Sequence, residues 1–113
     1  MQVPQDAVLL RIFIGENDRA GHLPLYEAIV QAARKGGLAG ATVLRGPIGF
    51  GRSSIVHTTK ILRLSQDLPI IIEIVDAPDK IDAFLVDLDK MMGSGLVTLE
   101  KVKVLRYGEG NGA

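Results

Sequence analysis

A glycine-rich segment with flanking arginines contains the residues of this 113-residue sequence that could do chemistry. It begins RGPIGFGRSS and opens a stretch, residues 46–67, that shows no sustained apolar period. Glycines let backbone N–H groups approach a ligand closely, and arginine forks match the oxygens of phosphate and carboxylate. The segment therefore predicts an anion-binding site, made by Arg45, Gly46, Gly49, Phe50, Gly51, Arg52 and His57.

The local charge balance supports an anionic ligand. Between Arg45 and Asp67 the sequence has four basic residues and a single acidic one, whereas the whole chain has 13 of each and no net charge. Connections this long in compact domains are usually functional or disordered. An alternative stays open, in which the glycines serve a flexible hairpin and the charges face water.

Other chemistry finds less support in the sequence. The spacing Gly46-x-x-Gly49-x-Gly51 is neither the dinucleotide fingerprint nor a P-loop. His22 and His57 are far apart and no cysteine accompanies them, so we expect no metal site. No serine has a base and an orienting group at a recognisable spacing. We predict no catalytic residue and do not expect an enzyme, although a small enzyme acting at a subunit cleft remains an alternative.

The elements that must position the anion site follow from hydrophobic periodicity. We expect strands over 7–14, 41–45, 68–75 and 96–107, and helices over 24–35 and 78–92, the second capped by Asp76. The order βαββαβ predicts a ferredoxin-like α+β fold, with both helices on one face of an antiparallel sheet. The long loop then joins the second and third strands. A single domain spans 7–107, and residues 1–6 and 108–113 are expected to be flexible.

The sheet face without helices is too apolar to remain in water. Odd-numbered residues of the first and third strands would share this face, and most of them are apolar. We predict that it forms a subunit interface, made by Leu9, Arg11, Phe13, Ile71, Glu73 and Val75. Arg11 and Glu73 have opposite charges on neighbouring strands and are predicted to pair. The alternative is that both reach solvent at the ends of the sheet.

The amino-acid composition indicates the cellular compartment of the protein and argues against one class of partner. The chain has no cysteine, no signal-like N-terminus and no apolar run of membrane-spanning length, so we expect a cytoplasmic protein. A net charge of zero argues against nucleic acid as a partner. An RNA-binding module shares the βαββαβ order but needs exposed aromatics on its central strands, where this sequence offers only Phe13.

Several runs resemble the family known as domain of unknown function 190. They are PLYEAIV at 24–30, GATVLRG at 40–46, GFG at 49–51, HTTKILRLS at 57–65, DLP at 67–69 and IEIVD at 72–76. The resemblance covers roughly residues 8–107 and implies the fold of the PII-like signalling proteins, which are trimers of ferredoxin-like subunits. It also implies that residues 46–67 correspond to the PII T-loop.

The resemblance further implies a function. PII-like proteins often bind an adenine nucleotide at clefts between subunits and then modulate a partner. The implied effector is ATP, ADP, AMP or cyclic AMP, and the implied partner is a membrane transporter or channel, such as a fluoride channel. One departure concerns the glycine-rich PII B-loop, because its place holds only the shorter run Gly93-Ser94-Gly95.

Overall fold

The computed structural model of the chain describes residues 3–46 and 68–108. Its main elements follow the predicted βαββαβ order, and a small hairpin lies within the loop predicted after the first strand. The elements are β1 (Asp6–Gly15), β2 (Arg19–Ala20), β3 (Leu23–Pro24), α1 (Leu25–Lys35), β4 (Thr42–Arg45), β5 (Pro69–Asp76), α2 (Pro78–Met91) and β6 (Leu96–Lys103).

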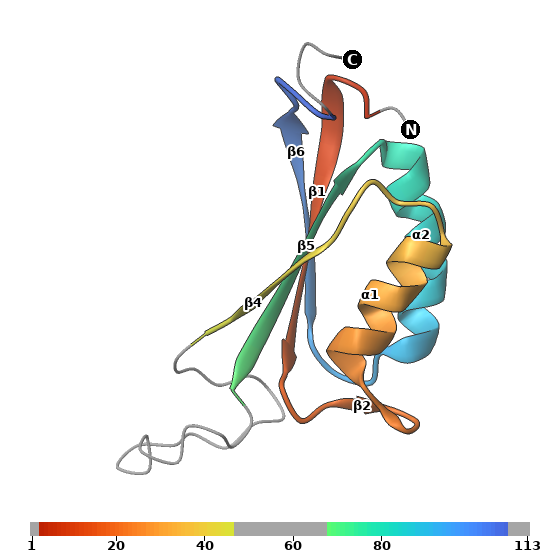
Figure 1. The fold of residues 1–113 in the computed structure, drawn as a ribbon, viewed down its shortest axis with the longest axis vertical. Coiled ribbons are helices and arrows are strands. Elements are labelled where there is room, and N and C mark those ends of the chain that lie inside the picture. The colour runs from red at the N-terminus through yellow and green to blue at the C-terminus, as the bar shows by residue number, and fades with distance from the viewer. Residues whose placement is uncertain (1–2, 47–67, 109–113) are drawn as a thin grey trace.

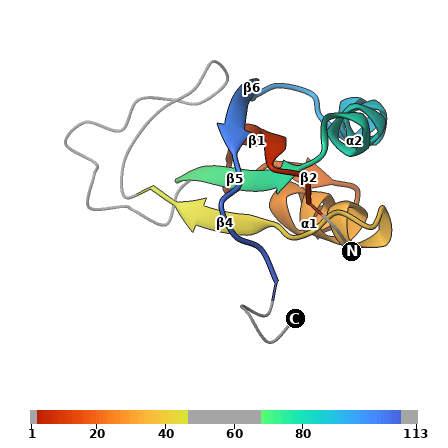
Figure 2. The ribbon, with the colours of Figure 1, turned by 90° about the horizontal axis from the view of Figure 1, so that it is seen from above.

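The main sheet has four strands in the order β4-β5-β1-β6, and all its neighbouring strands are antiparallel. Both helices lie on one face of this sheet and the other face has no helix (Figures 1 and 2). The predicted ferredoxin-like α+β fold is therefore confirmed. Neither helix has the length and apolar character needed to cross a bilayer, within the part of the chain that the structure describes.

The core lies between the sheet and the helices and is almost entirely aliphatic. Side chains alternate along a strand, so the even-numbered residues of β1 from Leu10 to Ile14 and of β5 from Ile70 to Ile74 point toward the helices and are buried. One stripe of each helix is buried with them, and the largest fully buried apolar side chains are Leu10, Ile12, Ile29, Ile70, Ile72, Ile74, Ile81 and Leu88. Each such side chain contributes about 1.5–3 kcal/mol when it leaves water.

The end of α1 has the features typical of helix C-termini. Arg34 and Lys35 stand in its last turn, where positive charge complements the helix dipole. Gly37 follows with a φ of +78°, which a residue with a side chain rarely adopts. The chain can therefore turn directly from α1 toward β4.

The predicted cap of α2 by Asp76 is wrong. Ala77 occupies the N-cap position, without a side-chain hydrogen bond, and Asp76 is the last residue of β5. Its buried carboxylate accepts hydrogen bonds from the backbone N–H of Ala39, at 2.9 Å, and of Ala77, at 2.7 Å. The strand continues one residue further than predicted, which turns the carboxylate inward. Asp76 thus ties the segment before β4 to the junction between β5 and α2.

The last strand is shorter than the predicted range 96–107, because it ends at Lys103. Among the described strands its one neighbour is β1, whose first residue, Asp6, lies opposite Lys103. One more backbone hydrogen bond joins the Val104 N–H to the Gln5 carbonyl at 2.7 Å. Beyond this point the described part of the chain offers residues 104–107 no strand to pair with, and they leave the sheet.

We expect Asp76→Ala to lower the free energy of unfolding by about 2–4 kcal/mol, because it leaves two backbone N–H groups without an acceptor in a buried place. Chemical denaturation monitored by circular dichroism measures this loss. Asp82→Ala is the control, since Asp82 is exposed on α2. Equal stability of the two variants would contradict the role assigned to Asp76.

Candidate functional site

The open face of the sheet carries residues of all four strands. Strand register places Leu44, Ile71, Phe13 and Leu96 in one row across it, and Thr42, Glu73, Arg11 and Thr98 in the next. Leu44 and Leu96 are 45% and 56% exposed. The six residues predicted for the interface, Leu9, Arg11, Phe13, Ile71, Glu73 and Val75, all lie on this face and are all partly exposed. The structure thus brings them together, and their contact with another subunit remains a prediction.

The predicted pairing of Arg11 with Glu73 is confirmed. The two residues are directly opposite on β1 and β5, and Arg11 Nε donates to Glu73 Oε2 at 2.7 Å. Arg11 Nη1 also lies 3.4 Å from Glu100 Oε1 on β6. The hydrogen bond to Glu73 raises the pKa of Arg11 above its usual value. One guanidinium therefore links three strands in the middle of a largely apolar face.

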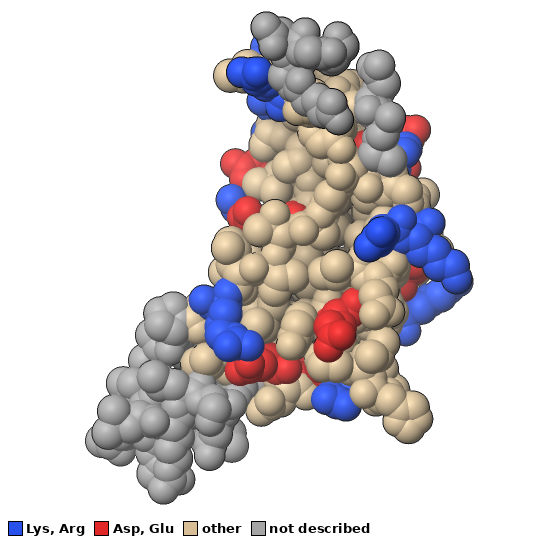
Figure 3. Space-filling model, viewed as in Figure 1, with Lys and Arg blue, Asp and Glu red and all other residues tan. Residues whose placement is uncertain are grey.

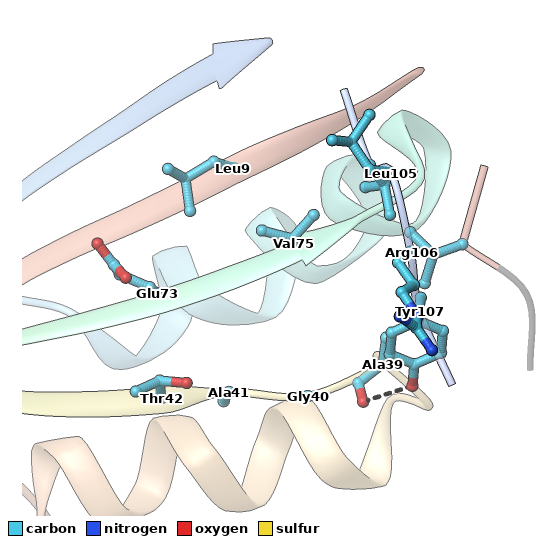
Figure 4. A pocket seen from close by; sticks show the side chains of 12 residues that line it. Leu9, Ala39, Gly40, Ala41, Thr42, Glu73, Val75, Leu105, Arg106 and Tyr107 are labelled. Carbon is cyan, nitrogen blue, oxygen red and sulfur yellow. Dashed lines mark hydrogen bonds between the residues drawn. The ribbon is translucent and has the colours of Figure 1, made fainter. Parts of the chain in front are cut away.

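A cavity of about 510 Å³ lies on the open face, near the end of β5 (Figure 4). Leu9 and Val75 contribute apolar surface from β1 and β5, and residues 39–42 form one side. Residues 104–107, which leave the sheet after β6, also line the cavity, and Leu105, Arg106 and Tyr107 cross one end of it (Figure 4). The Tyr107 hydroxyl donates to the Ala39 carbonyl at 3.0 Å and so joins this segment to residues 39–42.

Two charged side chains line this cavity. Glu73 stands at one side, where Arg11 holds its carboxylate, and Arg106 stands at the other. Within residues 3–46 and 68–108, Arg106 has no ion-pair partner. Apolar surface with a hydrogen-bond acceptor and a free guanidinium suits an organic anion that has a flat apolar part and a donor group.

Leu9, Glu73 and Val75 are among the residues predicted for the interface. Arg106, Tyr107 and Thr42 also line the cavity and are not among the predicted site residues. The places of Arg106 and Tyr107 depend on where the last strand ends, which is Lys103 and not the predicted residue 107. The signal that could have found Arg106 is a cation three residues after the end of the last strand, followed by Tyr107-Gly108.

A second group of contacts lies at the base of the long loop. Arg45 Nη2 is 2.5 Å from Glu16 Oε2, and the Gly46 N–H donates to the Pro69 carbonyl at 2.8 Å. A Cβ on Gly46 would lie 2.8 Å from Pro69 Cγ, so this close approach favours glycine. The other predicted ligand residues, Gly49, Phe50, Gly51, Arg52 and His57, lie outside the described residues.

The cavity and the loop base lie at opposite ends of β5. Pro69 begins this strand at the loop base, whereas Val75, near its other end, lines the cavity. On the face of the molecule seen in Figure 3, acidic and basic side chains are neighbours beside the loop base, and the middle is mostly uncharged. Within one chain, Arg45 and Gly46 therefore do not line the cavity.

Comparison with known proteins gives concordant results. The profile of the DUF190 family, described as "Uncharacterized ACR, COG1993", matches residues 7–104. A UPF0166 protein of Aquifex aeolicus is 38% identical over 97 residues, which are 86% of this chain and 91% of that protein.

Solved structures of CPII from Thiomonas intermedia K12 share the fold. The structure bound to ADP, AMP and acetate has a TM-score of 0.61 at 17% identity, with 94% of each chain covered. A second structure, described as a nitrogen regulatory PII-like protein bound to ADP, AMP and bicarbonate, has a TM-score of 0.61 at 16% identity. It covers 90% of this chain and 96% of that one.

We expect a double-mutant cycle of Arg11→Gln and Glu73→Gln to be non-additive. Arg11→Gln leaves Glu73 without its counter-ion on an apolar face, and Glu73→Gln leaves Arg11 with only the longer contact to Glu100, whereas the double change removes both charges of the pair. Urea unfolding of the four proteins at one protein concentration measures the coupling. Glu27→Gln and Lys101→Gln, which change exposed charges on separate elements, should be additive. Additivity in the Arg11 and Glu73 cycle would show that their contact does not stabilise the fold.

Proposed function

The chain belongs to the DUF190 family, and on this premise we propose that it is a regulatory protein that binds an adenine nucleotide and signals its presence to a partner. The observation that carries the proposal is the cavity on the open sheet face, with Glu73 and Arg106 on its walls. Its volume of about 510 Å³ falls in the range of ligand pockets, roughly 300–1,000 Å³.

The cavity residues suit the parts of an adenine nucleotide. The adenine ring would lie on the apolar surface of Leu9 and Val75, which flat aromatic rings favour. Glu73 would accept a hydrogen bond from the exocyclic amine or from the ribose hydroxyls, and Arg106 would bind phosphate. CPII, which shares the fold, has been solved with ADP and AMP. We therefore take ATP, ADP, AMP and cyclic AMP as the candidate effectors.

We propose that a homotrimer completes the site. The open face exposes apolar side chains at both edges, Leu44 on β4 and Leu96 on β6, and a second subunit would cover them. In a ring of subunits, one side of each subunit contacts the opposite side of the next subunit. Such a contact places the loop base of one copy, with Arg45 and Gly46, beside the cavity of another. The cleft between subunits would then hold the base on one copy and the phosphates on both.

We also propose that the role is binding without catalysis. The cavity offers groups that recognise a ligand, whereas the described residues form no cluster of three or more side chains that could hold a metal. Residues 46–67 would report the bound state to a membrane transporter or channel, such as a fluoride channel. This partner rests on the family resemblance alone.

We expect the wild-type protein to bind at least one of ATP, ADP, AMP and cyclic AMP in calorimetry. Arg106→Ala should weaken binding by about 10-fold or more, because a hydrogen bond to a charged group contributes roughly 1.5–3 kcal/mol. Lys35→Ala removes an exposed charge from the end of α1 and should leave the affinity unchanged. Absence of binding of all four nucleotides at millimolar concentration would refute the nucleotide proposal.

We expect wild-type protein at micromolar concentration to be a trimer in light scattering. Phe13→Asp should dissociate or unfold it, since an unpaired charge in an apolar interface costs several kcal/mol. Val86→Asp is the matched control, because Val86 is 59% exposed on α2, on the helical side of the molecule. A stable wild-type monomer, or a Phe13→Asp trimer with normal stability, would place the interface elsewhere.

A further inference from the structure

Glu16 is the residue that contacts both described ends of the long loop. Its backbone N–H donates to the Leu68 carbonyl at 2.7 Å, just after the loop, and its carboxylate binds Arg45, just before it. The Glu16 side chain is 19% exposed, whereas that of Arg45 is 55% exposed. The acidic partner is thus held in place and the basic partner faces solvent.

The second carboxylate oxygen of Glu16 has an uncommon environment. Oε1 is buried and accepts no hydrogen bond, as far as the structure describes the chain. A buried polar atom without a partner is costly and calls for an explanation. Among the described residues, the partner of the Glu16 carboxylate is therefore Arg45, through Oε2. The two charges cancel at the loop base.

We propose that Glu16 is an internal counter-ion that opposes the binding of anionic ligands at Arg45 and reduces the differences between their affinities. The inference rests on the proposed function, because it assigns Arg45 to the anion site. Arginine has five N–H donors in a fork, and the ion pair with Glu16 is made through Nη2. A ligand can therefore use the exposed donors of Arg45 while Glu16 stays beside it.

This arrangement reduces the preference of the site for highly charged ligands. An anion that approaches Arg45 also meets the repulsion of Glu16, and Coulomb repulsion grows with the charge of the ligand. The penalty is therefore largest for the most highly charged ligand. Glu16 reduces the advantage of a triphosphate over a monophosphate, which lets the site respond to nucleotides that differ in phosphate number.

The test is the substitution Glu16→Gln, which keeps the size of the side chain and an oxygen that can accept from Arg45, but removes the charge. The probes are orthophosphate, pyrophosphate and tripolyphosphate, together with AMP and ATP, titrated by calorimetry at constant ionic strength. We expect Glu16→Gln to tighten tripolyphosphate binding by about tenfold and orthophosphate binding by about twofold, since repulsion scales with charge.

The matched control is Glu27→Gln, which makes the same change of net charge at an exposed position of α1 and should leave every affinity unchanged. If Glu16→Gln melts at a lower temperature than the wild type, Glu16→Ala replaces it and the same ranking is expected. Unchanged or weaker binding in the Glu16 variant, or an equal gain for all probes, overturns the inference and points to a purely structural ion pair.

The inference and the proposed function can fail separately. If the Glu16 variant tightens polyphosphates in order of charge and no adenine nucleotide binds, the nucleotide proposal fails and the counter-ion role stands. If nucleotides bind the wild type and the variant equally, the counter-ion role fails and the proposed function stands. If neither protein binds any phosphate, both are refuted.

Discussion

The structure depends on one constraint, which is that two helices can cover only one face of a four-stranded sheet. Side chains alternate between the faces, so the even-numbered residues of β1 from Leu10 on and those of β5 are buried beneath the helices, and their odd-numbered neighbours face the other way. In this chain the second set is mainly apolar as well, with Phe13 and Ile71 at its centre. The uncovered face is therefore where the molecule has surface available for a ligand or another subunit.

The ion pair between Arg11 and Glu73 neutralises the two charges at the centre of this apolar face and fixes the positions of both side chains. A charge among apolar side chains needs a partner, and the register of β1 and β5 supplies one directly opposite. Glu73 also lines the cavity, so Arg11 fixes the position of the cavity's acidic group. The same contact thus serves the packing of the sheet and the chemistry of the candidate site.

The sequence allowed most of the fold to be predicted, because periodicity and helix-ending glycines are local signals. The pairing of Arg11 with Glu73 followed from the strand order that these signals implied. Asp76 and residues 104–107 were assigned wrongly, since their places depend on which strand still has a neighbour to pair with. Arg106 and Glu16 were missed for a related reason: each owes its role to a segment distant in sequence, residues 39–42 for one and Arg45 for the other.

The short strand β4 joins the two parts of the candidate site. Residues 39–42 line the cavity and Arg45 ends the strand at the loop base. Every residue of β4 pairs with β5, so the strand is held at a fixed register along its whole length. Within one chain, this strand is therefore the shortest covalent route between the cavity and the loop base, where Arg45 forms its ion pair with Glu16.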